Sequence, residues 1–137
     1  MVSMKKSQKR ILIIDDDYSF IRLLHKWLKV ANYDTLEALD GTSGFEKAKS
    51  DAPDLILLDI ILPDIDGKDV ARRLHEDPVT RHIPIIFTTV CIDIKVDKGD
   101  QKIVIDGKSY QGFAKPLHNA KLLSAIRKAI NRRIYNK

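Results

Sequence analysis

Three separated groups of charged residues in this chain could act together chemically. Asp15 and Asp16 follow one apolar run, Asp59 follows a second and Lys115 follows a third. Two unit charges 4 Å apart at an effective dielectric of 20 repel by roughly 4 kcal/mol, so gathered carboxylates call for a cation. Mg²⁺ prefers carboxylate oxygens, and a lysine ammonium can neutralise a phosphoryl oxygen. These residue types therefore predict a pocket for a divalent cation and a phosphoryl group, suited to phosphoryl transfer to a carboxylate.

The chain also contains the elements needed to bring these groups together. Short apolar runs alternate with stretches whose apolar residues recur at helical spacing. The predicted strands are 10–14, 33–39, 54–59 and 84–89, with a further buried run at 112–114, and the predicted helices are 19–31, 42–50, a segment around 70–74 and a last one reaching about residue 133. This alternation predicts a doubly wound parallel sheet, in which ligands bind beyond the carboxyl ends of the strands.

One segment interrupts the alternation where a fourth helix would come, before Lys115. Residues 92–96 alternate between apolar and polar, and the runs Lys102–Ile105 and Lys108–Tyr110 are rich in β-formers. The dipeptide Asp106-Gly107 between those two runs is typical of a type I′ hairpin turn. We expect a β-hairpin to replace most or all of the fourth helix.

Length and composition exclude several classes of protein. With 137 residues and 44% hydrophobic residues, the chain is expected to form one domain over 1–137 with a core at about 9–133. No run approaches the ~20 apolar residues of a membrane span, and no signal peptide begins the chain, so we expect a cytoplasmic location and no membrane partner. The net charge of +5 lies mostly near the ends and predicts solvated surfaces, so nucleic-acid binding is not expected. The single cysteine, Cys91, excludes an internal disulfide.

Four motifs follow one another along the chain: Ile11–Asp16, Leu55–Asp59 with Leu62–Gly67, Pro84–Thr89 and Ala114–Pro116. In this order they resemble the receiver domain of two-component response regulators. Each motif alone is weak, but the ordered set spans nearly the whole chain. The resemblance implies a flavodoxin-like, five-stranded sheet of order 2-1-3-4-5, with the hairpin inserted in place of the fourth helix.

The resemblance also implies a role for each residue of the site. Asp59 would accept a phosphoryl group from a histidine kinase or phosphotransfer protein. Mg²⁺ would be held by Asp15, Asp16, Asp59 and the backbone carbonyl of Ile61, with Asp15 acting largely through water. The phosphate and switch residues would be Thr89, its neighbour Val90 and Lys115, and Pro116 would follow a cis peptide bond.

The chain departs from the family pattern at several positions. Val90 replaces the usual small residue, and Gly112 replaces the usual aromatic, so the usual coupling between threonine and aromatic is not expected. Ile61 and Cys91 stand where polar side chains can help water attack an acyl phosphate, which predicts a long-lived phosphorylated form. The edge of the hairpin is a candidate for strand addition by a partner.

The sequence therefore predicts a stand-alone receiver that signals to an unknown downstream protein by changed protein contacts. The only catalysis expected is its own Mg²⁺-dependent phosphorylation and slow dephosphorylation. A pseudo-receiver that never takes phosphate is the alternative. A haloacid-dehalogenase-type phosphatase is disfavoured because Ile61 stands where its second aspartate would be, and a flavin protein is disfavoured because no glycine- and hydroxyl-rich loop follows the first strand. The kinase, the stimulus and the oligomeric state are not specified by the sequence.

Overall fold

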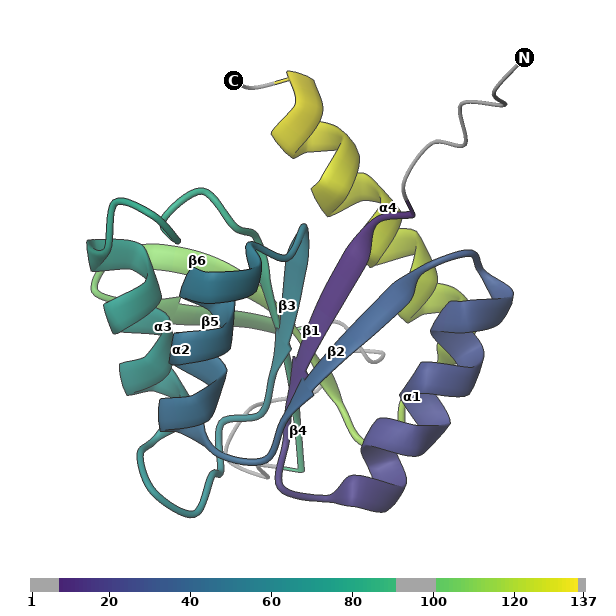
Figure 1. Cartoon of the computed structure of the whole chain (residues 1–137), viewed down its shortest axis with the longest axis horizontal. Helices are drawn as coiled ribbons and strands as arrows, with labels where there is room; N and C mark the ends of the chain where they lie inside the picture. The colour runs from purple at the N-terminus through teal and green to yellow at the C-terminus, as the bar shows by residue number, and fades with distance from the viewer. Residues whose placement is uncertain (1–7, 91–100, 136–137) are drawn as a thin grey trace.

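The computed structural model describes residues 8–90 and 101–135 and shows one sheet between two layers of helices (Figure 1). In chain order its elements are β1 (Arg10–Ile14), α1 (Tyr18–Val30), β2 (Asp34–Ala38), α2 (Gly41–Asp51), β3 (Leu55–Leu58), α3 (Gly67–Glu76), β4 (Ile85–Thr89), β5 (Gln101–Ile105), β6 (Lys108–Ala114) and α4 (Asn119–Tyr135). The strand order is β2-β1-β3-β4-β6-β5, with every pair parallel except β5 and β6.

The predicted α/β fold is confirmed, with the five parallel strands in the predicted order. Strand β6 takes the fifth position and joins the two predicted runs 108–110 and 112–114 into one strand. The hairpin adds β5 as a sixth, antiparallel strand at the edge of the sheet. The alternating residues 92–96 lie outside the described residues. None of the described helices is long and apolar enough to cross a membrane.

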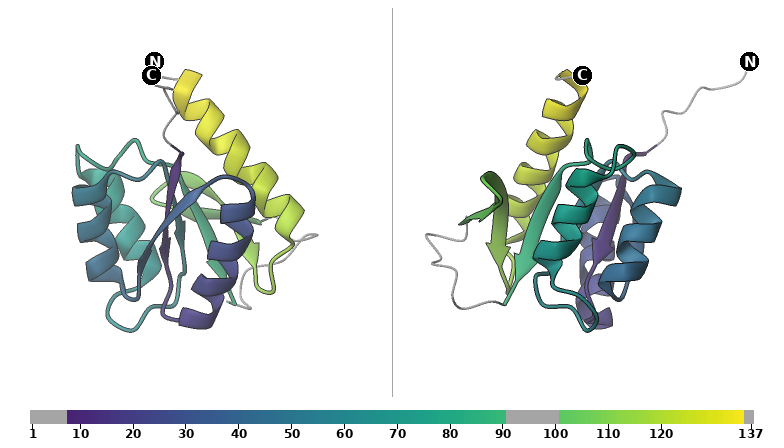
Figure 2. Two further views of the ribbon diagram at one scale, coloured as in Figure 1. Left: turned by 45° about the vertical axis from the view of Figure 1, so that its right-hand side comes forward. Right: turned by 90° about the vertical axis from the view of Figure 1, so that its left-hand side faces the viewer.

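Two apolar cores lie on opposite faces of the sheet because β3, and β1 after Arg10, are apolar and buried on both faces. Helices α2 and α3 cover one face, and α1 and α4 cover the other (Figures 1 and 2). Side chains alternate between the two cores, so Leu12 and Ile14 face α2 and α3, whereas Ile11 and Ile13 face α1 and α4. This alternation decides which face each polar residue at a strand end will occupy.

Aspartates begin the first three helices. The side chains of Asp17, Asp40 and Asp66 accept hydrogen bonds from backbone N–H groups in the first turns of α1, α2 and α3. Such caps satisfy donors that have no partner within the helix. Asp17 therefore caps the start of α1.

The hairpin is fastened to α3 and to the core. At its turn, Asp106 and Gly107 both have positive φ, at 51° and 82°, as a type I′ turn requires. Asp106 accepts from Arg72 of α3 at 3.0 Å, and the ring of Tyr110 packs edge-on against Phe87 with centroids 5.6 Å apart. These contacts let the hairpin cover apolar surface beside α3 that would otherwise need another helix.

Replacing Gly107 by alanine should destabilise the protein, because a Cβ is unfavourable at a φ of 82°. We expect a loss of about 1 kcal/mol in the free energy of unfolding, measured by urea denaturation. Apart from residues 106–108 themselves, no atom lies within 4 Å of the added Cβ, so the loss would report backbone conformation and not a clash. Asparagine tolerates this conformation better, so Gly107→Asn should lose less. Equal losses for both variants would contradict this explanation.

Candidate functional site

The charged groups predicted from the sequence come together at the carboxyl edge of the sheet. The ammonium Nζ of Lys115 lies 2.6 Å from Oδ2 of Asp15 and 3.2 Å from Oδ2 of Asp59. Carboxylate oxygens of Asp15, Asp16 and Asp59 lie within 4.8 Å of one another. Residues 100 positions apart in the chain thus form one site, which is the arrangement that phosphoryl chemistry at a carboxylate requires.

Backbone hydrogen bonds hold these residues just beyond the ends of their strands. The N–H of Asp15 donates to the carbonyl of Ala38, and that of Asp59 donates to the carbonyl of Ile14, both at 3.0 Å. The N–H of Lys115 donates to the carbonyl of Thr89 at 2.9 Å, and the Lys115-Pro116 peptide bond is cis. The ladder pattern therefore continues one residue past each strand and fixes where the side chains start.

Two carboxyl groups of the site are buried, so their negative charges need a positive group close by. Asp15 is fully buried and Asp59 is 3% exposed, whereas Asp16 is exposed. Burial raises the pKa of the Asp15 carboxyl above its ordinary value, although hydrogen bonds from Lys115 and from the N–H of Asp17 favour the ionised form. Burial also disfavours the Lys115 ammonium, but the two neighbouring carboxylates outweigh it and raise the pKa of Lys115. Lysine therefore stays charged and compensates the two buried acids.

Further contacts orient the three buried groups. The second oxygen of Asp15 accepts from the N–H of Asp17 at 2.9 Å, and Oδ1 of Asp59 accepts from the N–H of Ile61 at 3.1 Å. The Lys115 ammonium lies 4.1 Å from the centre of the Phe20 ring, a cation–π distance. Each carboxylate thus keeps one oxygen on the backbone and one toward the lysine.

Gly67, the first residue of α3, lets the helix approach the backbone of Asp59. A Cβ at this position would lie 2.0 Å from the carbonyl oxygen of Asp59 and 2.7 Å from Cα of Ile60. The N–H of Gly67 also donates to the carbonyl of Ile60 at 2.7 Å. Only glycine permits this close contact. Helix α3 is therefore anchored directly behind the acidic residue at the end of β3.

The hydroxyls at the end of β4 point to different faces of the sheet. Thr88 and Thr89 are both buried, but strand alternation places Thr88 on the face of Asp59 and Lys115. Thr89 lies two residues after Phe87, so its side chain is on the same face of the sheet, toward α2 and α3. The side chain of Val90 is 58% exposed. The family resemblance points to Thr89 alone, and the face occupied by Thr88 follows only from the strand register.

Gly112 lies on the Thr89 face, opposite Phe87 in the ladder. A Cβ on Gly112 would lie 2.8 Å from Cδ1 of Ile103 in the hairpin strand β5. The space beside this position is thus filled by the hairpin. The neighbouring Phe113 faces the other way, toward α1 and α4, and Tyr110 packs with Phe87.

The loop after Asp59 is tied to a distant helix by Asp64. Its two carboxylate oxygens accept from the N–H groups of Gly41 and Thr42 at 2.7 and 2.8 Å, and from the Thr42 hydroxyl at 2.7 Å. These bonds, led by the one from the Thr42 hydroxyl, lower the pKa of the exposed Asp64 carboxyl well below its ordinary range. Asp64 therefore serves as a second acceptor at the start of α2, not only as a turn former.

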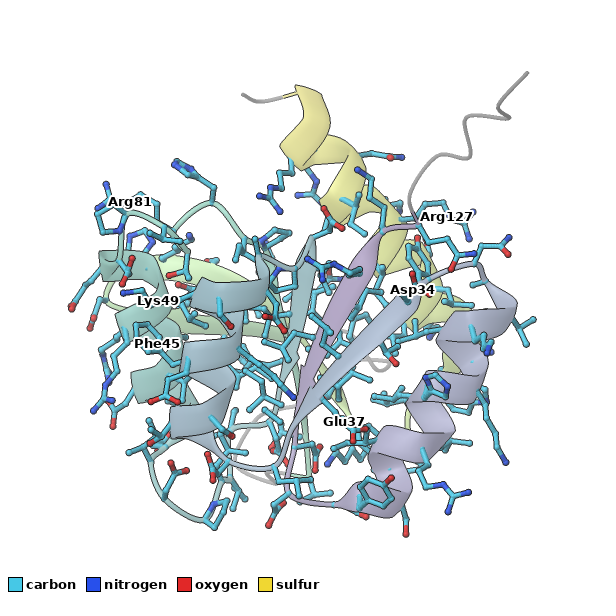
Figure 3. The ribbon with its side chains drawn as sticks, in the orientation of Figure 1. Asp34, Glu37, Phe45, Lys49, Arg81 and Arg127 are labelled. Carbon is cyan, nitrogen blue, oxygen red and sulfur yellow. The ribbon has the colours of Figure 1, made fainter. Side chains whose placement is uncertain are left out.

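A cavity of about 680 Å³ lies at the opposite, amino edge of the sheet, away from the carboxylates. It is bordered by the starts of β4 and β6 and by the end of α4, and its lining includes the basic residues Lys108, Arg132 and Arg133 together with His82. Figure 3 shows two more basic side chains, Arg81 and Arg127, near this edge and on opposite sides of the sheet. The basic side chains of this cavity contrast with the three aspartates clustered at the carboxyl edge.

The residues at the carboxyl edge fit a magnesium ion. Three aspartates offer oxygens close enough to share one ion, and one of them, Asp16, is exposed to solvent. Mg²⁺ is commonly held by one or two carboxylates and keeps several waters, which a half-open carboxylate site permits. The donor set contains only oxygen, so it suits a hard cation rather than zinc.

Comparison with known proteins agrees with this geometry. The family model described as the response regulator receiver domain matches residues 11–127. The response regulator PleD of Caulobacter vibrioides is 36% identical over 118 residues, which cover 86% of this chain and 25% of that protein. The polar-differentiation response regulator DivK of Brucella anthropi is 29% identical over 119 residues, covering 87% of this chain and 94% of that protein. This chain thus spans about a quarter of PleD but nearly all of DivK.

Solved structures share the fold. The signal receiver domain of an HD domain-containing protein from Pseudomonas fluorescens superposes with a TM-score of 0.80 at 25% identity, covering 93% of this chain and 98% of that one. The receiver domain of the sensor histidine kinase PA1611 from Pseudomonas aeruginosa, which has a magnesium ion coordinated in its active site cleft, gives a TM-score of 0.77 at 23% identity. That match covers 90% of this chain and 98% of the other.

Acid should remove the contribution of Asp64 to stability. Its pKa is lower in the folded protein than the unfolded value of about 4, so the contribution is present above that pH and declines as the pH falls below it. We expect Asp64→Asn to unfold at lower urea concentration than the wild type at pH 7, with the difference narrowing at pH 3. Thr42→Ala, which removes one of the three hydrogen bonds, should show a smaller difference at pH 7. A larger difference in unfolding urea concentration between the wild type and Asp64→Asn at pH 3 than at pH 7 would contradict a lowered pKa of Asp64.

Proposed function

The chain belongs to the response regulator receiver domain family, and on that premise we propose that it accepts a phosphoryl group on Asp59 and signals through changed contacts with other proteins. The observation that supports this most directly is the contact of the Lys115 ammonium with both Asp15 and Asp59. A buried carboxylate beside a fixed ammonium and two further acids is suited to receive a phosphoryl group. The donor would be a histidine kinase or a phosphotransfer protein.

In the proposed reaction a carboxylate oxygen of Asp59 attacks the phosphorus of a phosphohistidine. A new O–P bond forms as the P–N bond breaks, and the bonding electron pair leaves with the imidazole nitrogen. The product is a mixed anhydride on Asp59. Lys115 would move from the Asp59 oxygen toward a phosphoryl oxygen, where its positive charge stabilises the charge that develops on the transferred group. Thr89 lies one residue beyond the level of Asp59, at the edge of the sheet, where its hydroxyl would donate to another phosphoryl oxygen, with Val90 beside it at the rim.

Asp15, Asp16, Asp59 and the backbone carbonyl of Ile61 would hold Mg²⁺, with Asp15 acting largely through water. When bound, the ion would supply charge neutralisation among the acids and on the phosphoryl oxygens. The chain's own residues do the remaining work. Lys115 compensates the buried pair, and Gly67 and the Ile61 N–H fix the position of the acceptor carboxylate.

A phosphorylation-independent interaction module is the second candidate, favoured by one observation. The hairpin side chain Ile103 fills the space beside Gly112, so no aromatic ring stands on the Thr89 face at that position. If Thr89 moved on phosphorylation, no aromatic side chain at position 112 could move together with it. The acidic site itself is complete, however, and we therefore place phosphorylation first.

Incubation with acetyl phosphate and Mg²⁺ should add the mass of one phosphoryl group to the wild type. Intact-mass spectrometry measures this directly, and Asp59→Asn should gain nothing because the amide is a poor nucleophile. Asp34→Asn, which changes an exposed carboxylate at the start of edge strand β2, is the matched control and should behave like the wild type. A wild type without any adduct would leave the interaction module as the function.

The same samples, followed after removal of the donor, should lose the phosphoryl group slowly. The exposed side chain of Ile61 lies two residues beyond the acceptor and has no polar atom to orient an attacking water. Ile61→Gln should shorten the lifetime several-fold. If Ile61→Gln lost its phosphoryl group at the same rate as the wild type, another group would control the hydrolysis.

Magnesium should stabilise the folded protein through the same acids. Binding to the folded state alone adds about 2.7 kcal/mol when the free ion is at 100 times its Kd. We expect Mg²⁺ to raise the melting temperature of the wild type and EDTA to reverse the rise. Asp16→Asn should lose most of this effect, because it removes an exposed carboxylate without disturbing the buried ion pairs. A full response in that variant would exclude Asp16 as a ligand.

A further inference from the structure

Thr88 carries a buried hydroxyl that nothing in the described structure satisfies. The residue is 1% exposed, and its Oγ1 has no hydrogen-bond partner among the described residues. Among the described residues, only one other buried side-chain nitrogen or oxygen atom has no hydrogen-bond partner, namely Oδ1 of Asn119 at the start of α4. An unsatisfied buried hydroxyl costs about 1–3 kcal/mol, so its presence calls for an explanation.

The register of the sheet places Thr88 level with the acceptor. Leu58 pairs with Phe87, so the next residues, Asp59 and Thr88, lie side by side at the ends of β3 and β4. On its other side Thr88 pairs with Phe113 of β6, which belongs to the core under α1 and α4. Asp59, Thr88 and Phe113 therefore form one row across this face of the sheet.

The Lys115 side chain must pass over this row. Lys115 follows β6, Asp59 follows β3, and β4 lies between those strands. To reach Asp59 at 3.2 Å and Asp15 at 2.6 Å, the lysine crosses β4 on the face that Thr88 occupies. The hydroxyl thus lies on the same face of the sheet as an ion pair whose members already bond to each other.

In the unphosphorylated protein the oxygens of Asp59 are occupied. Oδ1 accepts from the Ile61 N–H and Oδ2 accepts from Lys115. Phosphorylation on Oδ1 would draw the lysine toward the phosphoryl group and leave Oδ2, then the acyl oxygen of Asp59, without that donor. The only hydroxyl in the row of Asp59, Thr88 and Phe113 belongs to Thr88.

We infer that Thr88 is a positioning residue for the phosphorylated state, in which its hydroxyl donates to the acyl oxygen that Lys115 releases. This inference rests on the proposed function of Asp59. A hydroxyl that has no hydrogen bond in one state and has one in the other favours the second state. The size of this preference is the free energy of that hydrogen bond. Thr88 would therefore bias the equilibrium toward the phosphorylated form, separately from Thr89 on the opposite face.

The test replaces Thr88 by valine, which keeps the shape and removes the hydroxyl. Beryllium fluoride, which mimics a phosphoryl group on a carboxylate, serves as a probe that does not hydrolyse. By titration calorimetry at saturating Mg²⁺, Thr88→Val should bind it about tenfold more weakly than the wild type, as expected for one lost hydrogen bond. Thr88→Ser retains the hydroxyl and should bind within twofold of the wild type.

Stability measurements separate this role from a structural one. Without probe, Thr88→Val should unfold at the same urea concentration as the wild type or a higher one, because it removes an unsatisfied group. The matched control is Thr80, also 1% exposed, whose hydroxyl donates to the carbonyl of Leu74 at 2.7 Å. Thr80→Val should lower stability and leave beryllium fluoride affinity unchanged.

The outcomes distinguish the two proposals. Wild-type affinity in Thr88→Val, with phosphorylation of the wild type intact, would overturn the role of Thr88 alone. Weak binding in both Thr88→Val and Thr88→Ser would also overturn it, because the loss would then follow packing and not the hydroxyl. A wild type that neither gains phosphoryl mass nor binds beryllium fluoride would overturn the proposed function and this inference together.

Discussion

The ion pairs of Lys115 are the interaction on which the carboxyl edge of the sheet depends. They bring together the ends of β1, β3 and β6, and they compensate two carboxylates that the core has almost entirely removed from water. Leaving a buried charge unpaired costs roughly 3–5 kcal/mol, so these groups are tied to one another whatever else the site binds. The ammonium is also the one group here that can follow charge from a carboxylate to a phosphoryl oxygen, because its stem is long and its head is compact.

Much of this arrangement could be predicted from the sequence because its signals are local. Four buried apolar residues precede Asp15 in β1, and four precede Asp59 in β3, so these short runs define both the strand and the edge where the charge lies. Lys115 follows the shorter run 112–114 in the same way. The hairpin was predictable for the same reason, since Asp106-Gly107 suits only a narrow set of turns. In each case a few adjacent residues carry the information.

The features that could not be predicted depend on contacts between distant segments. The side chain of Asp64 looks like a turn former until α2 is placed against its loop, 22 residues away in sequence. Thr88 and Thr89 are chemically identical neighbours, and only the pairing of β4 with β3 and β6 shows which one shares a face with Asp59. The close approach of Gly67 to Asp59 likewise requires the helix and the strand to be docked.

Helix α3 connects the acidic site with the hairpin that distinguishes this chain. Its first residue, Gly67, contacts the backbone of Asp59, and one and a half turns later Arg72 holds Asp106 at the hairpin turn. The hairpin in turn places Ile103 against Gly112, on the face of β4 that carries Thr89. A short helix is stiff along its axis. The Asp59 backbone and the hairpin turn therefore contact the same rigid element, α3. In this chain α3 therefore contacts both the end of β3 and the hairpin turn, and neither contact involves a side chain at position 112.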